Sequence, residues 1–228
     1  MSFLNNLFFG YYPYIAGTVF LVGSVVRFDM SQYTWKTNSS QLFDSSRRFR
    51  LGNALFHIGV IFLFFGHLIG LLMPHSWYPI FGLTATSKQL LAMISGGLFG
   101  VLALIGGAIL IHRRLTNERV RANSGQMDLF ILLLLYVQLI LGMLTIPISA
   151  THLDGSMMLL LADWAQHIVT FRPEAAAYVA EASWVFKLHL FLGITIFLLF
   201  PFTRLVHIWS APVWYLGRSY QLVRQRQA

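Results

Sequence analysis

The sequence predicts an all-α fold, an integral membrane bundle of five transmembrane helices. Of the 228 residues, 57% are hydrophobic and only 11% are charged, which is too apolar for an ordinary soluble domain. Five segments also have the roughly 20 apolar residues that a bilayer core of about 30 Å requires. Helices are favoured because backbone groups in lipid must bond within their own segment, and these segments largely lack the polar stripe of a soluble bundle.

In chain order, the expected spans are residues 3–26, 54–73, 90–111, 129–148 and 184–209. The first has no basic stretch before it and no convincing cleavage site after it, so we interpret it as a retained span. The longest loop, residues 149–183, mixes acidic and aromatic side chains and could hold a short helix on the surface. The basic segment 211–228 is too polar to span and suits a cytoplasmic tail. With no domain boundary or internal repeat, we expect residues 1–228 to form a single membrane domain.

The positions of lysine and arginine predict the direction of the spans, because cytoplasmic loops carry an excess of these residues. Thirteen fall on one side, namely Arg27, Lys36, Arg47, Arg48, Arg50, Arg113, Arg114, Arg119, Arg121, Arg204, Arg218, Arg224 and Arg226. Only Lys88, Arg172 and Lys187 fall on the other. We therefore expect a periplasmic N-terminus and a cytoplasmic C-terminus. The net charge of +8 sits in short runs between apolar blocks, so a membrane protein explains it better than nucleic-acid binding does.

Four histidines lie inside apolar segments, two on each of two expected helices. His57 and His67 belong to the second span, and His189 and His207 belong to the fifth. Imidazole is costly to place in hydrocarbon without a partner, so such histidines are candidates for function. For a single one, a hydrogen bond to a neighbouring helix is as good an explanation as metal ligation. Two pairs on two helices are what two bis-histidine haems stacked across a bilayer require.

The direction of the spans assigns these histidines to two depths. The second span runs outward and the fifth runs inward. Antiparallel packing then matches His57 with His207 near the cytoplasm, and it matches His67 with His189 near the outside. Each pair could supply both axial ligands of one haem iron. The chain has no cysteine, which excludes a c-type haem attachment and an iron–sulfur cluster held by this chain alone.

The spacing of the histidines differs between the two helices. Ten residues separate His57 from His67, a helical rise of about 15 Å. Eighteen separate His189 from His207, a rise of about 27 Å. Straight helices would not present both pairs equally well, so the pairing requires tilt or a bend, which Pro201 is placed to provide.

Other residues near these histidines fit a cofactor. The glycines are Gly52, Gly59, Gly66 and Gly70 on the second span and Gly193 on the fifth. They leave room for a porphyrin face, although close helix packing explains them equally well. Arg204, three residues before His207, could pair with a haem propionate or anchor the inner end of the span. The remaining histidines, His75, His112, His152 and His167, fit interfacial or solvated roles better, and a quinone-site role for one of them stays open.

Five segments carry a resemblance to a known family: FLNNLFFGYYPYIAGTVFLVGS, QYTWKTNSSQ, LFHIGVIFLFFGHLIGLLMPH, MLTIPISATHLDGS and KLHLFLGITIFLLFPFTRLVHIWSAPVWYLGRSYQLVR. In this order and spacing they resemble the gamma subunit of membrane-bound respiratory nitrate reductase, the cytochrome b subunit of a three-subunit complex. The resemblance runs over nearly the whole chain. It implies five helices, two haem b groups and quinol oxidation in the bacterial cytoplasmic (inner) membrane.

The resemblance also implies roles for particular residues. The ligands of the inner, proximal haem fall on His57 and His207, and those of the outer, distal haem fall on His67 and His189. A lysine implicated at the family's quinol site falls on Lys88, and His67 borders the same pocket. From the residues alone, a lysine reaching for the membrane interface explains Lys88 better.

The activity implied is oxidation of menaquinol or ubiquinol. Electrons would pass from the outer to the inner haem, then to an iron–sulfur beta subunit and a molybdenum alpha subunit that reduces nitrate in the cytoplasm.

Two other functions stay open. The chain could be the cytochrome b subunit of a different complex, such as a sulfur-compound reductase. It could also be a haem-free transporter or metal-ion channel that uses the histidines as a polar path. Such a path would usually include carboxylates within the spans. Asp29, Asp44, Glu118, Asp154, Asp163, Glu174 and Glu181 all fall outside the expected spans, and Asp128 starts the fourth.

Overall fold

The computed structural model of the chain describes residues 3–37, 40, 46–211 and 217. All regular secondary structure in these residues is helical. Five helical segments are long and apolar enough to cross a membrane, which confirms the predicted number. They are Phe3–Thr34, Arg47–Leu72, Ala85–Thr116, Gln126–Ala150 and Trp184–Phe202. The expected tail, residues 211–228, lies outside the described residues except for Ala211 and Gly217.

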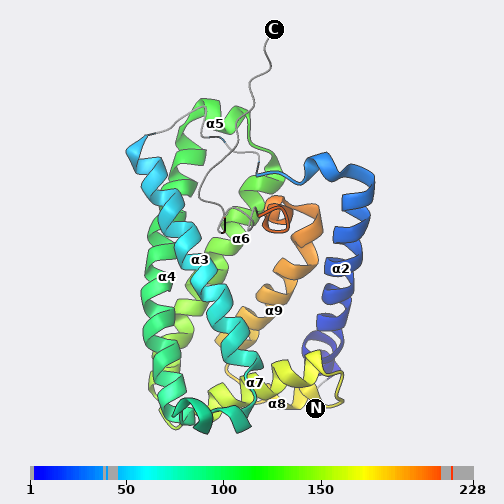
Figure 1. Cartoon of the computed structure of the whole chain (residues 1–228), viewed down its shortest axis with the longest axis vertical. Coiled ribbons are helices and arrows are strands. Elements are labelled where there is room, and N and C mark those ends of the chain that lie inside the picture. The colour runs from blue at the N-terminus through cyan, green and yellow to red at the C-terminus, as the bar shows by residue number, and fades with distance from the viewer. Residues whose placement is uncertain (1–2, 38–39, 41–45, 212–216, 218–228) are drawn as a thin grey trace.

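The helices run up and down the long axis and pack on one another as a series of neighbours (Figure 1). α3 (Arg47–Leu72) packs along α4 (Ala85–Thr116), and α4 packs on α6 (Gln126–Ala150). α6 contacts α9 (Trp184–Leu199), which packs in turn on α2 (Tyr12–Ser31).

The two ends of the bundle are closed differently. Where the N-terminus lies, α7 (Ser156–Val169) and α8 (Ala175–Tyr178) cross the ends of the spans (Figure 1). These helices confirm the short helix expected in the longest loop. We call this end of the bundle the N-terminal end. At the opposite end, which we call the basic end, α5 (Glu118–Ala122) joins α4 to α6. The basic end carries Arg113 and Arg114 in the last turn of α4.

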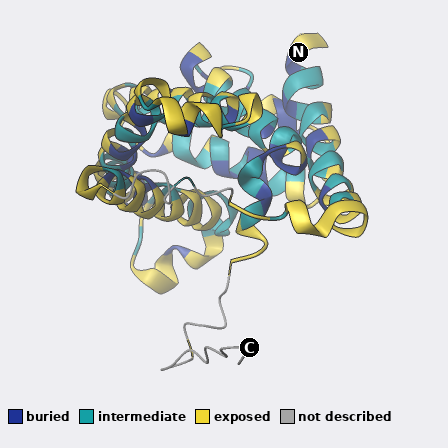
Figure 2. Ribbon diagram, turned by 90° about the horizontal axis from the view of Figure 1, so that it is seen from above, coloured by how far each residue is buried: buried dark blue, intermediate teal, exposed yellow. Residues whose placement is uncertain are grey.

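The outward faces of the spans are apolar, as faces in contact with lipid are. Figure 2 shows exposed residues on the outside of the bundle and buried residues between the helices. Leu21, Ile61 and Ile94 are 60%, 51% and 63% exposed, and they belong to three different spans. A protein surrounded by water rarely exposes apolar surface on this scale, so these faces suit a membrane.

Glycines allow α3 and α4 to pack with their backbones in contact. A Cβ added at Gly59 would lie 2.6 Å from the Phe99 carbonyl oxygen. One added at Gly106 would lie 2.4 Å from the Phe56 backbone nitrogen. Neither position can accept a side chain unless the neighbouring helix moves, which is the small-residue packing common between membrane helices.

The first span is longer than expected. α1 (Phe3–Asn6) leads into a π-helical turn, η1 (Leu7–Tyr11), and α2 then continues to Ser31, beyond the predicted end. Asp29 is therefore helical, on an exposed position near the end of α2.

The fifth span is interrupted, which corrects the expectation of one helix over residues 184–209. The α-helix ends at Leu199, and a 3-10 turn, η5 (Phe200–Phe202), follows it. Thr203 is extended, with φ −118° and ψ 178°, before a second 3-10 turn, η6 (Arg204–Ile208). Pro201 explains the break because its ring nitrogen has no hydrogen to donate within a helix.

Arg27 on α2 holds this break in place. Its Nη1 donates to the Pro201 carbonyl at 2.7 Å and to the Thr203 carbonyl at 2.8 Å. Carbonyls at the end of a helix have no partner within the helix and need one elsewhere. Gly23 lies against the same bend, where an added Cβ would lie 2.9 Å from the Pro201 ring. The surface of α2 is therefore fitted to the bend.

α7 ties together segments that are far apart in the sequence. Its Trp164 donates from Nε1 to the Phe9 carbonyl at 2.9 Å. Gln166 donates from Nε2 to the carbonyls of Leu71 and Met73, both at 3.1 Å. These two carbonyls lie at the C-terminal end of α3, where intrahelical partners are missing. Hydrogen bonds from α7 thus fix the first span and α3 relative to each other at the N-terminal end.

Candidate functional site

Each of the two histidines of α3 forms a hydrogen bond from one ring nitrogen to a backbone carbonyl. His57 donates from Nδ1 to the Asn53 carbonyl at 2.8 Å, and His67 donates from Nδ1 to the Leu63 carbonyl at 2.7 Å. A carbonyl can only accept, so each Nδ1 carries the proton and each Nε2 keeps its lone pair. Histidines that bind metals commonly have this arrangement, because the second hydrogen bond fixes the ring and raises its basicity.

His67 lies opposite His189 of α9. The centroids of the two imidazole rings are 6.1 Å apart, and their planes are tilted by 44°. Two imidazoles bound to opposite sides of one metal, each through a bond of about 2 Å, have ring centroids about 6 Å apart. The separation of this predicted pair therefore fits two axial ligands of one iron.

α6 contributes two contacts to His189 that we did not predict. Gln138 donates from Nε2 to the His189 carbonyl at 3.1 Å, and the same nitrogen lies 3.5 Å from the ring atom Nε2 of His189. Gly142 passes so close that an added Cβ would lie 3.0 Å from Cε1 of the ring. The available signal was a single polar residue in the apolar run LLLLYVQLILG, since amides between membrane helices usually bond across them.

His189 differs from the histidines of α3 in one respect. Its Nδ1 is buried and has no hydrogen-bond partner among the described residues. A buried polar atom without a partner costs free energy unless something else satisfies it. This unpaired nitrogen also agrees with a site that takes a further group.

His207 lies on η6, beyond the break in the fifth span. Its Nδ1 donates to the Arg204 carbonyl at 2.5 Å, so its Nε2 also keeps a lone pair. His57 lies in the half of α3 that begins at the basic end. The structure thus places both members of the second predicted pair toward the basic end.

The break at Pro201 accounts for the unequal spacing of the histidines. Ten residues lead from His189 to the last residue of α9, Leu199, which is a rise of about 15 Å. The same number separates His57 from His67 on α3. The residues that follow turn away from the α9 axis (Figure 1), so the chain reaches His207 without the rise of a straight helix.

The glycines of α3 fall into two groups. Gly52 and Gly59 face α4, and a Cβ on Gly52 would lie 2.6 Å from the Ile109 side chain, so both serve helix packing. Gly66 and Gly70 have no atom of the described residues within 4 Å of an added Cβ. They flank His67 and leave space beside it, as a flat cofactor or a quinone ring requires.

Lys88 is buried in the first turn of α4 and does not reach for the interface. It donates from Nζ to the Tyr78 hydroxyl oxygen, and Nζ lies 4.0 Å from the centroid of the Tyr78 ring. Only 6% of Lys88 and 4% of Tyr78 are exposed. A lysine with a purely interfacial role keeps its ammonium in water. The position of Lys88 therefore favours a specific role over an interfacial one.

Arg204 donates to the Thr37 carbonyl at the basic end. Its guanidinium also interacts electrostatically with Asp128 in the first turn of α6. These contacts suit an anchor of the inner end, and pairing with a haem propionate stays a prediction.

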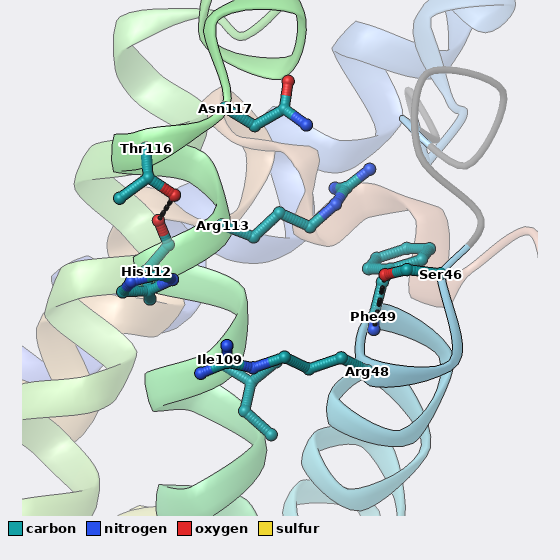
Figure 3. A pocket seen from close by; sticks show the side chains of 8 residues that line it. All are labelled: Ser46, Arg48, Phe49, Ile109, His112, Arg113, Thr116 and Asn117. Atoms are coloured by element: carbon teal, nitrogen blue, oxygen red, sulfur yellow. Dashed lines mark hydrogen bonds between the residues drawn. The ribbon is translucent and has the colours of Figure 1, made fainter.

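The four other histidines lie near the ends of the spans. His75 Nε2 is 3.5 Å from Asp163 Oδ1, and His167 Nε2 is 3.2 Å from the Tyr178 hydroxyl. His152 Nδ1 lies 2.9 Å from the hydroxyl of the preceding threonine. His112 borders a pocket between the start of α3 and the end of α4 (Figure 3).

That pocket is separate from both histidine pairs. Its lining consists of Ser46, Arg48, Phe49, Ile109, His112, Arg113, Thr116 and Asn117 (Figure 3). The Arg113 guanidinium packs over the Phe49 ring, 4.0 Å from its centroid. The pocket therefore belongs to the basic end and contributes nothing to the N-terminal pair.

Together these features define a class of protein, a helical membrane protein in which two histidines face each other between two spans. Among the described residues, no group of three or more His, Cys, Asp or Glu side chains could hold a metal ion. A metal at these sites would therefore be held by two imidazoles, which suits a haem iron, whose other ligands come from the porphyrin.

Comparison with known proteins gives the family. Residues 5–226 match the family model of the nitrate reductase gamma subunit. The chain is 53% identical to the respiratory nitrate reductase 2 gamma chain of Escherichia coli (strain K12), over 100% of both chains. It is 53% identical to the respiratory nitrate reductase 1 gamma chain of that organism, over 99% of this chain and 100% of the other. The nitrate reductase gamma chain of Bacillus subtilis (strain 168) is 34% identical, over 97% of this chain and 99% of the other.

The chain belongs to the nitrate reductase gamma subunit family, which confirms the resemblance found in the sequence. Its members are the haem-containing cytochrome b chains of respiratory nitrate reductase, an oxidoreductase complex in which catalysis sits in a partner subunit. The match over the full length favours this family over the alternative of a sulfur-compound reductase.

Proposed function

We propose that this chain oxidises a membrane quinol, menaquinol or ubiquinol, for a respiratory nitrate reductase. His67 and His189 would hold an outer haem b, and the basic-end pair would hold an inner one. When bound, the haems would supply one-electron redox chemistry. The partners that would receive the electrons are an iron–sulfur beta subunit and a molybdenum alpha subunit. The observation that carries the proposal is the 6.1 Å between the His67 and His189 ring centroids.

The groups that prepare these sites belong to the chain itself. The hydrogen bonds from Nδ1 of His57, His67 and His207 to backbone carbonyls orient the rings and leave Nε2 available. Arg204 would pair with a propionate at the basic end. Because the porphyrin carries the redox chemistry, the protein contributes ligands, orientation and burial.

We assign the quinol site to Lys88 and His67 at the N-terminal end. An ammonium has three donors, and one bond to Tyr78 leaves others for a quinol oxygen. The space beside Gly66 and Gly70 supports a ring-shaped substrate near His67.

The proposal places the N-terminal end in the periplasm and the basic end in the cytoplasm of a bacterial inner membrane. Quinol oxidation would then release protons outside while electrons move inward, and each charge crossing is worth about 2.3 kcal/mol per 100 mV. The absence of native cysteine makes single-cysteine labelling clean. An impermeant maleimide should label exposed Glu174→Cys in spheroplasts with an intact inner membrane, and exposed Glu118→Cys only after lysis. The reverse pattern would contradict this orientation.

A reduced-minus-oxidised visible spectrum of the purified complex, with haem quantitation, tests the cofactor content. We expect two b-type haems for each gamma chain, both reduced by added quinol. A flat spectrum would overturn the proposal.

A further inference from the structure

We propose that Tyr78, His75 and Asp163 form a proton-exit path from Lys88 to the surface at the N-terminal end. The inference rests on the proposed function. Oxidation of one quinol to a quinone releases two electrons and two protons, and the electrons leave toward the basic end. The protons need a separate way out of the apolar bundle, close to where the quinol is oxidised.

The path begins in the buried contact between Lys88 and Tyr78. The ammonium donates to the phenol oxygen, and both side chains are almost fully enclosed. A phenol can accept one hydrogen bond and donate another, so Tyr78 can pass a proton on without a lasting change of charge. Once the Lys88 ammonium has passed a proton to the phenol oxygen and Tyr78 has released its own, the neutral amine can take a proton from a quinol oxygen.

The next members connect Tyr78 to the surface. The His75 and Tyr78 rings are in contact, with centroids 5.3 Å apart and planes tilted by 50°. His75 Nε2 lies 3.5 Å from Asp163 Oδ1 on α7. The side chains of His75 and Asp163 are 37% and 30% exposed. The series thus leads from two enclosed side chains, Lys88 and Tyr78, to two partly exposed ones, His75 and Asp163.

The charges along this route favour a relay. Burial raises the pKa of Tyr78, and the negative charge of Asp163 raises it further. Tyr78 therefore keeps its proton at neutral pH and can donate it while it accepts another. The charged and titratable groups that face it are Lys88 from α4, Asp163 from α7 and His75 from its own segment.

The scaffold holds the last member in position. Gln166, three residues after Asp163 on α7, bonds the carbonyls of Leu71 and Met73 at the end of α3. The carboxylate is therefore fixed relative to the short segment that carries His75 and Tyr78. A fixed geometry is what proton transfer between neighbouring groups requires.

The test uses the intact three-subunit complex with the variants Tyr78→Phe and Asp163→Asn. Tyr78→Phe keeps the ring and its packing and removes only the hydroxyl. We expect quinol-driven haem reduction to slow by about a hundredfold or more, within the range for lost general acid–base catalysis. The solvent isotope effect on that step, the ratio of its rates in H2O and D2O, should be larger than in the unmodified complex. Haem content and haem reduction by a one-electron dye should stay unchanged. Free imidazole should restore part of the rate to His75→Gly.

His167→Gln is the matched control. His167 lies on α7 beside Asp163, bonds the Asp163 backbone carbonyl and pairs with Tyr178, so it is outside the path. The complex with His167→Gln should show the same rate of quinol-driven haem reduction and the same solvent isotope effect as the unmodified complex.

The possible results separate the path from the proposed function. If the unmodified complex reduces no haem with quinol, the proposed function fails and the path fails with it. If the unmodified complex is active and Tyr78→Phe and Asp163→Asn match it in rate and isotope effect, the path alone is overturned. A slower rate with an unchanged isotope effect would assign these residues a structural role and would also overturn it.

Discussion

The two histidine pairs are built differently, although each connects α3 with the fifth span. At the N-terminal end both rings stand on regular α-helices, and α6 sets the position of His189 through Gln138 and Gly142. At the basic end His207 stands on a 3-10 turn, and α2 fixes the break before it through Arg27. One pair thus depends on helix packing and the other on hydrogen bonds to an irregular segment. The two sites should therefore respond to different substitutions.

The largest effect should follow removal of a ligand. Replacing His67 or His189 with alanine should delete the outer haem and keep the inner one, because each variant lacks one of the two histidines that would hold the outer haem. Replacing His57 or His207 should do the reverse. Haem quantitation with a redox titration of the purified complex measures this. The assignment is wrong if every single variant keeps two haems.

The next effect should come from Arg27→Ala, which removes both donors to the bend. Hydrogen bonds from charged groups are worth about 1.5–3 kcal/mol each. The inner haem should be released at lower temperature, while release of the outer haem is unchanged. Visible spectra recorded during heating resolve the two. Arg27→Lys should recover part of the loss, and equal loss of both haems would contradict a local role.

A smaller effect should follow Gly142→Ala. The new Cβ would press on the His189 ring at 3.0 Å, and mild overpacking of this kind costs about 1 kcal/mol. The midpoint potential of the outer haem should shift while that of the inner haem does not. Gly97→Ala is the matched control, because its Cβ would lie 3.7 Å from Ile146 in an ordinary contact. Equal shifts in both variants would remove Gly142 from the site.

The smallest effect should come from Gln138→Leu, which removes the donor to the His189 carbonyl. Hydrogen bonds between membrane helices average about 0.6 kcal/mol, so the outer haem should become only slightly easier to release on heating. Complete loss of that haem would instead give Gln138 a direct part in holding the ring.

The sequence allowed the number of spans to be predicted, because lipid imposes both apolar length and internal backbone bonding. It also predicted that His67 would lie opposite His189. The shape of the fifth span could not be predicted from the sequence. Apolar residues continue past Pro201 to Trp209, and hydropathy does not distinguish a helix from 3-10 turns. What stabilises those turns is Arg27, which lies 174 residues before Pro201.

Side-chain environments were equally hard to predict where they depend on tertiary contacts. Gly52 and Gly66 are the same residue type on one helix, yet one packs against α4 and the other borders open space. Lys88 could be assigned a quinol role only by resemblance. Its burial depends on Tyr78, which a short 3-10 segment brings beside it.

The contacts of α7 also have a consequence for the order of biogenesis. Gln166 bonds Leu71 and Met73 across 95 and 93 residues, and Trp164 reaches Phe9 across 155. Until α7 has left the ribosome, the last carbonyls of α3 and the turn near the N-terminus lack these partners. The periplasmic side of the proposed topology would therefore gain these contacts only after four of the five spans have been synthesised.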